Sequence, residues 1–134
     1  DATYDLIAFG AEGMGDVILH AAVTTPPLLT VSAPDVANSL VPLDRAGDLA
    51  IAWEANGAEG DRVVIRVIDT FGQVLTAHAI DDGAFTIPAA ELGELAPGPA
   101  TLTIARERLF DLGLPEGHLR VVVRHEVWAD PDLT

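Results

Sequence analysis

The feature that most constrains the fold is a succession of short apolar runs, separated by turn-forming residues about every ten to fifteen positions. Glycine, asparagine, aspartate and proline occupy the breaks; glycine and asparagine accept positive φ, whereas proline fixes φ and lacks a donor. Many short runs at such spacing are typical of a β-sandwich or barrel. The runs with strand character are residues 4–9, 16–23, 28–32, 48–54, 62–68, 73–80, 84–87, 100–107 and 119–128.

Alternation within these runs predicts strands rather than helices. In residues 48–54, the bulky side chains of Leu49, Ile51 and Trp53 alternate with alanines. A period of two with one more polar face is typical of antiparallel sheets that cover a core. We therefore expect Trp53 to be a core residue. The same reasoning predicts further inward-facing side chains at Val63, Ile65, Val67, Leu102, Ile104, Val121 and Val123.

Two segments between the runs have a more specific local prediction. Residues 88–95 combine a leading proline with alanine, glutamate and leucine, which suits one or two helical turns. The Asp81-Asp82-Gly83 sequence predicts a hairpin turn, with the glycine at positive φ. The fold class predicted from the residues is therefore all-β, with antiparallel strands and one short helical crossover near residues 88–95.

Composition excludes several classes of function. The 134 residues suit one domain, and 21 acidic against 7 basic residues give a net charge of −14. Such a charge argues against nucleic acid or an anionic membrane surface as a partner, because both bind positive faces. The apolar runs are too short for membrane insertion. The chain has no cysteine, which removes disulfides and thiolate chemistry.

The order of elements after residue 27 resembles a known family. It comprises, in order, the segments Leu29–Pro34, Val41–Leu43, Gly47–Trp53, Asp61–Val67 and Ile80–Pro88, the short helix to Leu95, and Gly98–Ile104. The arrangement resembles Ig-like β-sandwich domains of secreted or surface lipoproteins from high-GC Gram-negative bacteria. The resemblance divides the chain into an N-terminal strand pair (1–27) and an Ig-like β-sandwich (28–134). It implies a secreted, periplasmic or cell-surface location and a non-enzymatic structural or binding role.

The start of the chain predicts a processed or trimmed sequence. Asp1 follows no initiator methionine, and no basic segment with an apolar core precedes the first strand. A mature secreted protein is expected to begin in this way, and so is a cloned fragment.

No motif in the sequence indicates catalysis. Ser32 and Ser39 are the only serines, and neither lies in a nucleophile motif. His20, His78, His118 and His125 are scattered, without a histidine two or four residues away. We therefore expect no enzyme, although a small acidic enzyme would be the interpretation if several of these groups converged.

Calcium is the cofactor that the sequence favours most. Asp61, Asp81 and Asp82 lie in predicted loops, and carboxylate oxygens at strand ends suit Ca²⁺. Glu59, Asp130 and Asp132 share this character. A calcium-binding adhesion module is therefore one alternative function. The preferred interpretation is that acidic loops keep an apolar, lysine-free domain in solution and that no cofactor is bound.

The N-terminal run must be covered by other parts of its own chain or by a neighbour. In residues 3–9, Tyr4, Leu6, Ile7 and Phe9 place apolar side chains on both faces of a strand, which is stable only when covered. We expect the run to close its own domain; the alternative is that it fills the sheet edge of a neighbour. The second arrangement predicts an extracellular fibre subunit joined by N-terminal strand exchange.

Overall fold

The computed structural model describes residues 2–8, 17–37, 42–114 and 117–134. Within these residues it contains β-strands and one short helix, which confirms the predicted all-β class. The elements in chain order are β1 (Thr3–Ala8), β2 (Val17–Thr24), β3 (Val31–Ala33), β4 (Leu49–Trp53), β5 (Arg62–Ile68), β6 (Val74–Ile80), β7 (Ala84–Ile87), α1 (Ala89–Leu92), β8 (Gly98–Pro99), β9 (Thr101–Leu114), β10 (Gly117–Ala129) and β11 (Asp132–Leu133).

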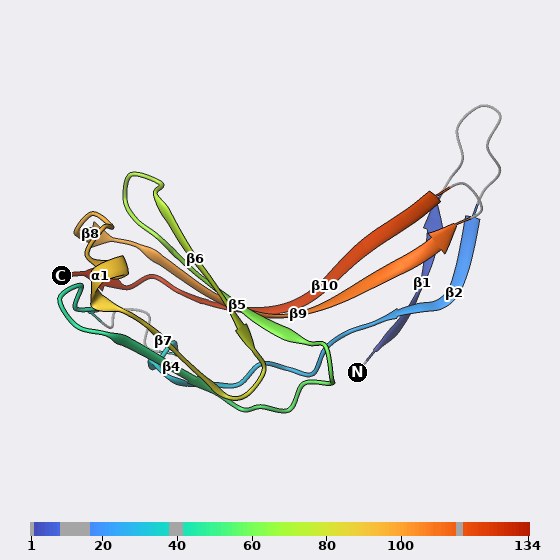
Figure 1. Ribbon diagram of the computed structural model, residues 1–134, viewed down its shortest axis with the longest axis horizontal. Coiled ribbons are helices and arrows are strands. Elements are labelled where there is room, and N and C mark those ends of the chain that lie inside the picture. The colour runs from blue at the N-terminus through green and yellow to red at the C-terminus, as the bar shows by residue number, and fades with distance from the viewer. Residues whose placement is uncertain (1, 9–16, 38–41, 115–116) are drawn as a thin grey trace.

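Two facing sheets form the sandwich. The larger has the strand order β10-β9-β5-β6, and the smaller has the order β3-β4-β7. Their ladders are antiparallel, as the alternation predicts. The small sheet lies across from β5 and β6 (Figure 1). The short strands β8 and β11 pair near the C-terminus, and a parallel bridge from Leu43 to Leu133 connects them to the loop before β4.

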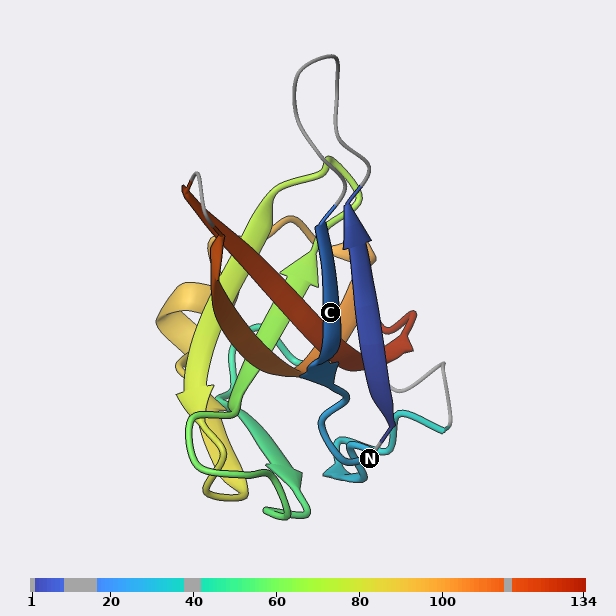
Figure 2. The same ribbon diagram turned by 90° about the vertical axis from the view of Figure 1, so that its right-hand side faces the viewer.

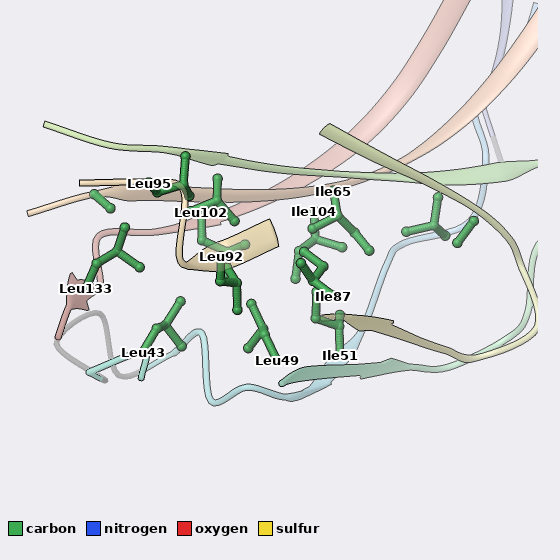
Figure 3. Packing of buried hydrophobic residues seen from close by; sticks show 14 of the residues in the cluster. Leu43, Leu49, Ile51, Ile65, Ile87, Leu92, Leu95, Leu102, Ile104 and Leu133 are labelled. Atoms are coloured by element: carbon green, nitrogen blue, oxygen red, sulfur yellow. The ribbon is translucent and has the colours of Figure 1, made fainter. Parts of the chain in front are cut away.

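The core lies between these sheets, where alternate side chains from both meet. Ile51 and Ile87 extend from the small sheet towards Ile65, Leu102 and Ile104 of the large one (Figure 3). Leu92 and Leu95, in and just after α1, are also buried and close one end of the sandwich. The inward positions of the strands are therefore filled with apolar side chains, and this burial is the main contribution to stability.

The predicted core is confirmed at eight of its ten positions, which are Leu49, Ile51, Trp53, Val63, Ile65, Val67, Leu102 and Ile104. Val121 and Val123 are only half-buried. They lie on the part of β10 whose partners are residues 108–110 of β9, beyond the rows that β5 pairs with. No strand of the small sheet is opposite them, so the alternation gave the correct face but not the depth of burial.

The predicted helical crossover is confirmed, whereas the prediction of a hairpin at Asp81-Asp82-Gly83 is wrong. α1 spans Ala89–Leu92, with Pro88 at its N-cap. Gly83 has φ of +100°, but the strands on either side of Asp81-Asp82-Gly83 do not pair. β6 pairs with β5 in the large sheet, and β7 pairs with β4 in the small one. The turn therefore carries the chain from one sheet across the core to the other.

The longest strands extend beyond the sandwich as an arm. β9 and β10 pair in an unbroken register from Leu102 with Ala129 to Leu114 with Gly117, whereas β5 pairs with β9 only as far as Glu107. The arm is the part of this pair beyond Glu107, residues 108–114 and 117–123. The hairpin of β1 and β2 lies beside it, on the same side as the small sheet (Figures 1 and 2). The predicted N-terminal strand pair thus exists, while its division from the sandwich at residue 27 stays a prediction.

Candidate functional site

The most unusual group of side chains lies where the arm leaves the sandwich. On β9, Leu102 and Ile104 face the core, and the next residues on that face are Arg106 and Arg108. Strand geometry therefore directs two guanidinium groups inward. Arg106 is 0 % exposed, which is rare for an arginine unless its charge is paired. We call Arg106, Arg108 and their partners Asp61 and Asp81 the arginine clamp.

Arg106 is held by both sheets and by the segment after β2. Its Nε and Nη2 donate to the two carboxylate oxygens of Asp81, at 2.7 and 3.1 Å. Its Nη1 donates to the carbonyl oxygens of Pro27, at 3.3 Å, and Leu28, at 2.9 Å, and its Nη2 also donates to that of Glu54. A bidentate ion pair with these additional acceptors compensates the loss of water around the charge.

Asp81 is itself fixed from two further sides. The indole Nε1 of Trp53 donates to its Oδ1 at 2.7 Å. Trp53 is thus a core residue, as predicted, with its polar atom satisfied at the edge of the core. Gly57 approaches the same carboxylate so closely that a Cβ there would collide with Oδ2. The sandwich therefore forms a fitted cradle around this one carboxylate.

The second pair of the clamp connects the loop before β5 to the hairpin. Arg108 donates from Nε and Nη2 to Asp61 at 2.7 and 2.8 Å, and from Nη1 to Thr24 Oγ1 at 2.8 Å. Burial raises the pKa of Asp61, but hydrogen bonds from Arg108 and the Ala58 N–H outweigh it, so the pKa lies below 3.8. The same hydrogen bond raises the pKa of Arg108. Both groups are therefore charged at neutral pH.

A third ion pair lies on the outer face of the same strands. Glu107 is buried, and its Oε2 accepts from Nε and Nη2 of Arg62 at 3.1 and 3.0 Å. The two residues are directly opposite in the ladder of β5 and β9. Successive residues of β9 thus bind β5, the cross-sheet turn and the hairpin, so the start of the arm is held from both faces.

Sequence reasoning missed the arginines of the clamp. The signal was present, because Arg106 and Arg108 continue the inward parity of Leu102 and Ile104. An arginine at a core-facing position requires a buried carboxylate, and loop aspartates are its natural partners. Treating each acidic loop residue as a cation ligand or a solvated charge hid that match.

The three calcium candidates are not brought together as one set of free carboxylates. Asp61 and Asp81 bind Arg108 and Arg106, respectively. Asp82 is exposed, and its Oδ1 accepts from the Ala84 N–H at 3.4 Å. Within the described residues, no three histidine, aspartate or glutamate side chains are grouped as a metal site. A calcium ion at Asp61 or Asp81 would have to compete with a guanidinium group already in place.

The interaction candidates lie in β1. Leu6 is half-buried and pairs with Leu19, whereas Tyr4 and Ile7 are exposed. Ile7 is directly opposite Ile18, which is also exposed. Phe9 and the glycine-rich segment 10–15 lie outside the described residues. β1 therefore pairs with β2 of its own chain, and one face of this hairpin carries apolar side chains in contact with water.

Comparison with protein families and with curated proteins finds no relative of the chain. No protein-family model matches the chain, and a search of curated proteins gives no match. Among the described residues, no helix has the length and apolar character needed to cross a membrane.

Proposed function

We propose that the chain is a secreted or cell-surface Ig-like β-sandwich with a non-enzymatic, structural or protein-binding role. The arginine clamp is the observation that carries this proposal. Its charged groups bind one another, backbone groups, the Trp53 indole and the Thr24 hydroxyl, and these bonds fix the position of the arm and the N-terminal hairpin. Buried ion pairs of this kind hold one arrangement of the chain, and here that arrangement includes the two-stranded arm.

The arm suits binding because it presents strand edges and apolar side chains and is held in place at its base. Leu109 and Val122 are paired with each other on the outer face of the arm, and both are exposed. Trp128 lies further along the same face of β10 and is 63 % exposed. Exposed aromatic and aliphatic side chains next to arginines are the composition of protein-binding surfaces.

The location is tested by tagging the chain with an epitope and expressing it in its own organism. Protease added to intact cells, or to cells with a permeabilised outer membrane, should remove the epitope while a cytoplasmic marker survives. An epitope that is degraded only after complete lysis would refute export, and with it the proposed function.

A fibre subunit that exchanges its N-terminal segment is the second proposal. It is favoured by the hairpin, which forms no ladder with any other described strand, and Arg108 donates hydrogen bonds to Thr24 at its end and to the following Thr25. Because β1 is paired with β2, the unit exchanged would be the hairpin rather than one strand. Light scattering of the full chain and of a variant lacking residues 1–24 tests this proposal. Concentration-dependent oligomers that the deletion abolishes would support it, and a full chain that is monomeric throughout would refute it.

A further inference from the structure

β10 has a long unpaired edge. Within the described part of the chain, its only strand partner is β9, and it lies at the outside of the β10-β9-β5-β6 sheet. It runs for 13 residues without proline or a bulge, which are two of the devices that prevent edge strands from pairing. A continuous edge of this length is a template for another strand.

The charge of β10 differs from that of the rest of the molecule. It carries Arg120 and Arg124 but only one acidic residue, Glu126, whereas the whole chain has a net charge of −14. Two copies of so acidic a protein repel each other over most of their surfaces. β10 is a place where two copies can approach without bringing acidic groups together.

The register of a symmetric pair follows from the strand itself. Residues opposite each other in an antiparallel pair share a face, so a two-fold axis perpendicular to the sheet must pass beside one residue. Val123 is the middle residue of Gly117–Ala129, so an axis there pairs the full length of both strands. Arg120 of each copy then lies opposite Glu126 of the other, and Val123 lies opposite itself.

The registers in which the axis is shifted by one residue also keep inward side chains opposite inward ones, but their charge pairs are unfavourable. An axis beside Val122 places Arg120 opposite Arg124 of the other copy, twice. An axis beside Arg124 places this residue opposite itself. Like charges directly opposite destabilise a strand pair, whereas opposite charges stabilise it. The side chains concerned are exposed in the single chain, where Arg120 lies 3.4 Å from Asp111 and Glu126 lies 3.5 Å from Arg124. Exposed ion pairs of this kind are individually weak, so pairs with a second copy can replace them.

The opposite edge of the same sheet suits a second copy less well. β6 is seven residues long, and its Val74 and Leu75 line a shallow groove together with Glu91 and Glu94. Two copies meeting there would bring these acidic side chains closer. β6 also contains no acidic, lysine or arginine side chain, so no ion pair between two copies of it would select one register.

From these observations we propose that β10 is a homodimerisation strand, which pairs antiparallel with β10 of a second copy in the register centred on Val123. The partner that we assign is thus a second copy of this chain, and the dimer would present two arms on one continuous sheet. This inference rests on the proposed binding role, because it names the partner of the arm.

Charge reversal tests the register. The wild-type chain should sediment at twice 14.0 kDa at high concentration. Arg120→Glu or Glu126→Arg should each weaken the dimer by roughly tenfold or more, and the double variant should restore it, because opposite charges again face each other. Unchanged circular dichroism would show that each variant remains folded. A monomer at every concentration, or a double variant as weak as the single ones, would overturn the proposal.

A cysteine cross-link provides a second, independent measurement, because the chain has no cysteine of its own. Val123→Cys should form an intermolecular disulfide under mild oxidation. Val121→Cys is the matched control: it is the same residue type on the same face, equally half-buried, but its copies would lie ~14 Å apart. Equal cross-linking of the two variants, or none at position 123, would contradict the register.

These outcomes are separate from those of the other proposals. Removal of residues 1–24 should leave a β10 dimer intact but abolish hairpin exchange. A strictly monomeric chain that is nevertheless exposed on the cell surface would remove the β10 proposal while leaving the proposed function standing.

Discussion

Replacing Asp81 by alanine should destabilise the protein severely, because it leaves the buried guanidinium of Arg106 without its counter-charge. The substitution removes two hydrogen bonds from Arg106 and one from Trp53. A hydrogen bond to a charged group contributes about 1.5–3 kcal/mol. The sum of three such bonds exceeds the loss that is usual when a buried ion pair is broken. The actual loss should be smaller than the sum, because Arg106 keeps its backbone acceptors. We therefore expect a loss of about 3–5 kcal/mol in the free energy of unfolding.

The assay is equilibrium unfolding in urea, followed by far-ultraviolet circular dichroism. Tryptophan fluorescence is unsuitable because Trp53 itself loses a hydrogen-bond partner. Arg106→Met, measured in the same way, should cost a similar amount, since it leaves Asp81 charged and buried. The double variant Asp81→Ala/Arg106→Met should cost at least ~2 kcal/mol less than the two single losses added together, because no buried charge remains.

Asp82→Ala is the matched control, because it removes the same charge from the next residue, which is exposed. It should change the stability by no more than about 0.5 kcal/mol. If Asp81→Ala costs under about 1 kcal/mol, or if the two single losses are additive, the clamp does not hold the arm to the sandwich as we argue.

Three further outcomes are expected. Trp53→Ala should lower the free energy of unfolding by about 3–5 kcal/mol in the same assay, and a loss below about 1 kcal/mol would contradict its place in the core. The lowered pKa of Asp61 means that its ionised form stabilises the fold above pH 3.8 and that this contribution disappears as the pH falls through the lower folded-state value. The difference in Tm between the wild type and Asp61→Asn should therefore shrink in that acid range, and a difference independent of pH would refute the assignment. Moderate NaCl should raise Tm by screening the charge of −14, and CaCl₂ at equal ionic strength should add nothing, because arginines occupy Asp61 and Asp81; an additional rise with calcium would establish a cation site.

Local structure was predictable because it depends on neighbouring residues. The alternation in β4, with Leu49, Ile51 and Trp53 on one face, fixes both the strand and its buried side. The glycine at position 83 predicts a residue with positive φ, and Gly83 has φ of +100°. The short helix after Pro88 follows from the same kind of local signal. Each of these inferences requires no knowledge of what lies across the core.

The pairing of strands was not predictable in the same way. Asp81-Asp82-Gly83 has the composition of a hairpin turn, but the side chains on either side decide otherwise. Ala79 of β6 and Ile87 of β7 are both buried in the core from opposite sheets, which a hairpin would place in a single sheet. The gain from covering two apolar faces outweighs the ladder that an adjacent hairpin would form.

The length of β9 was underestimated for a related reason. The charged residues 106–108 resemble the end of a strand, yet Phe110, Leu112 and Leu114 continue the inward parity to the end of the arm. They are half-buried because the N-terminal hairpin, and not the small sheet, lies on this side of the arm. A pattern along one strand cannot reveal which distant segment covers it.

The arginines of the clamp also explain how the sandwich and the arm with its hairpin keep one arrangement. A leucine at position 106 would extend the apolar core, but it could not bind the carbonyl oxygens of Leu28 and Glu54, which lie on different segments. Apolar contacts have no direction, whereas the planar guanidinium accepts only partners placed around its edge. The clamp therefore fixes where the segment after β2 crosses β9. Because that crossing also sets the position of the hairpin against the arm, the geometry of the arm is determined at Arg106 and Arg108.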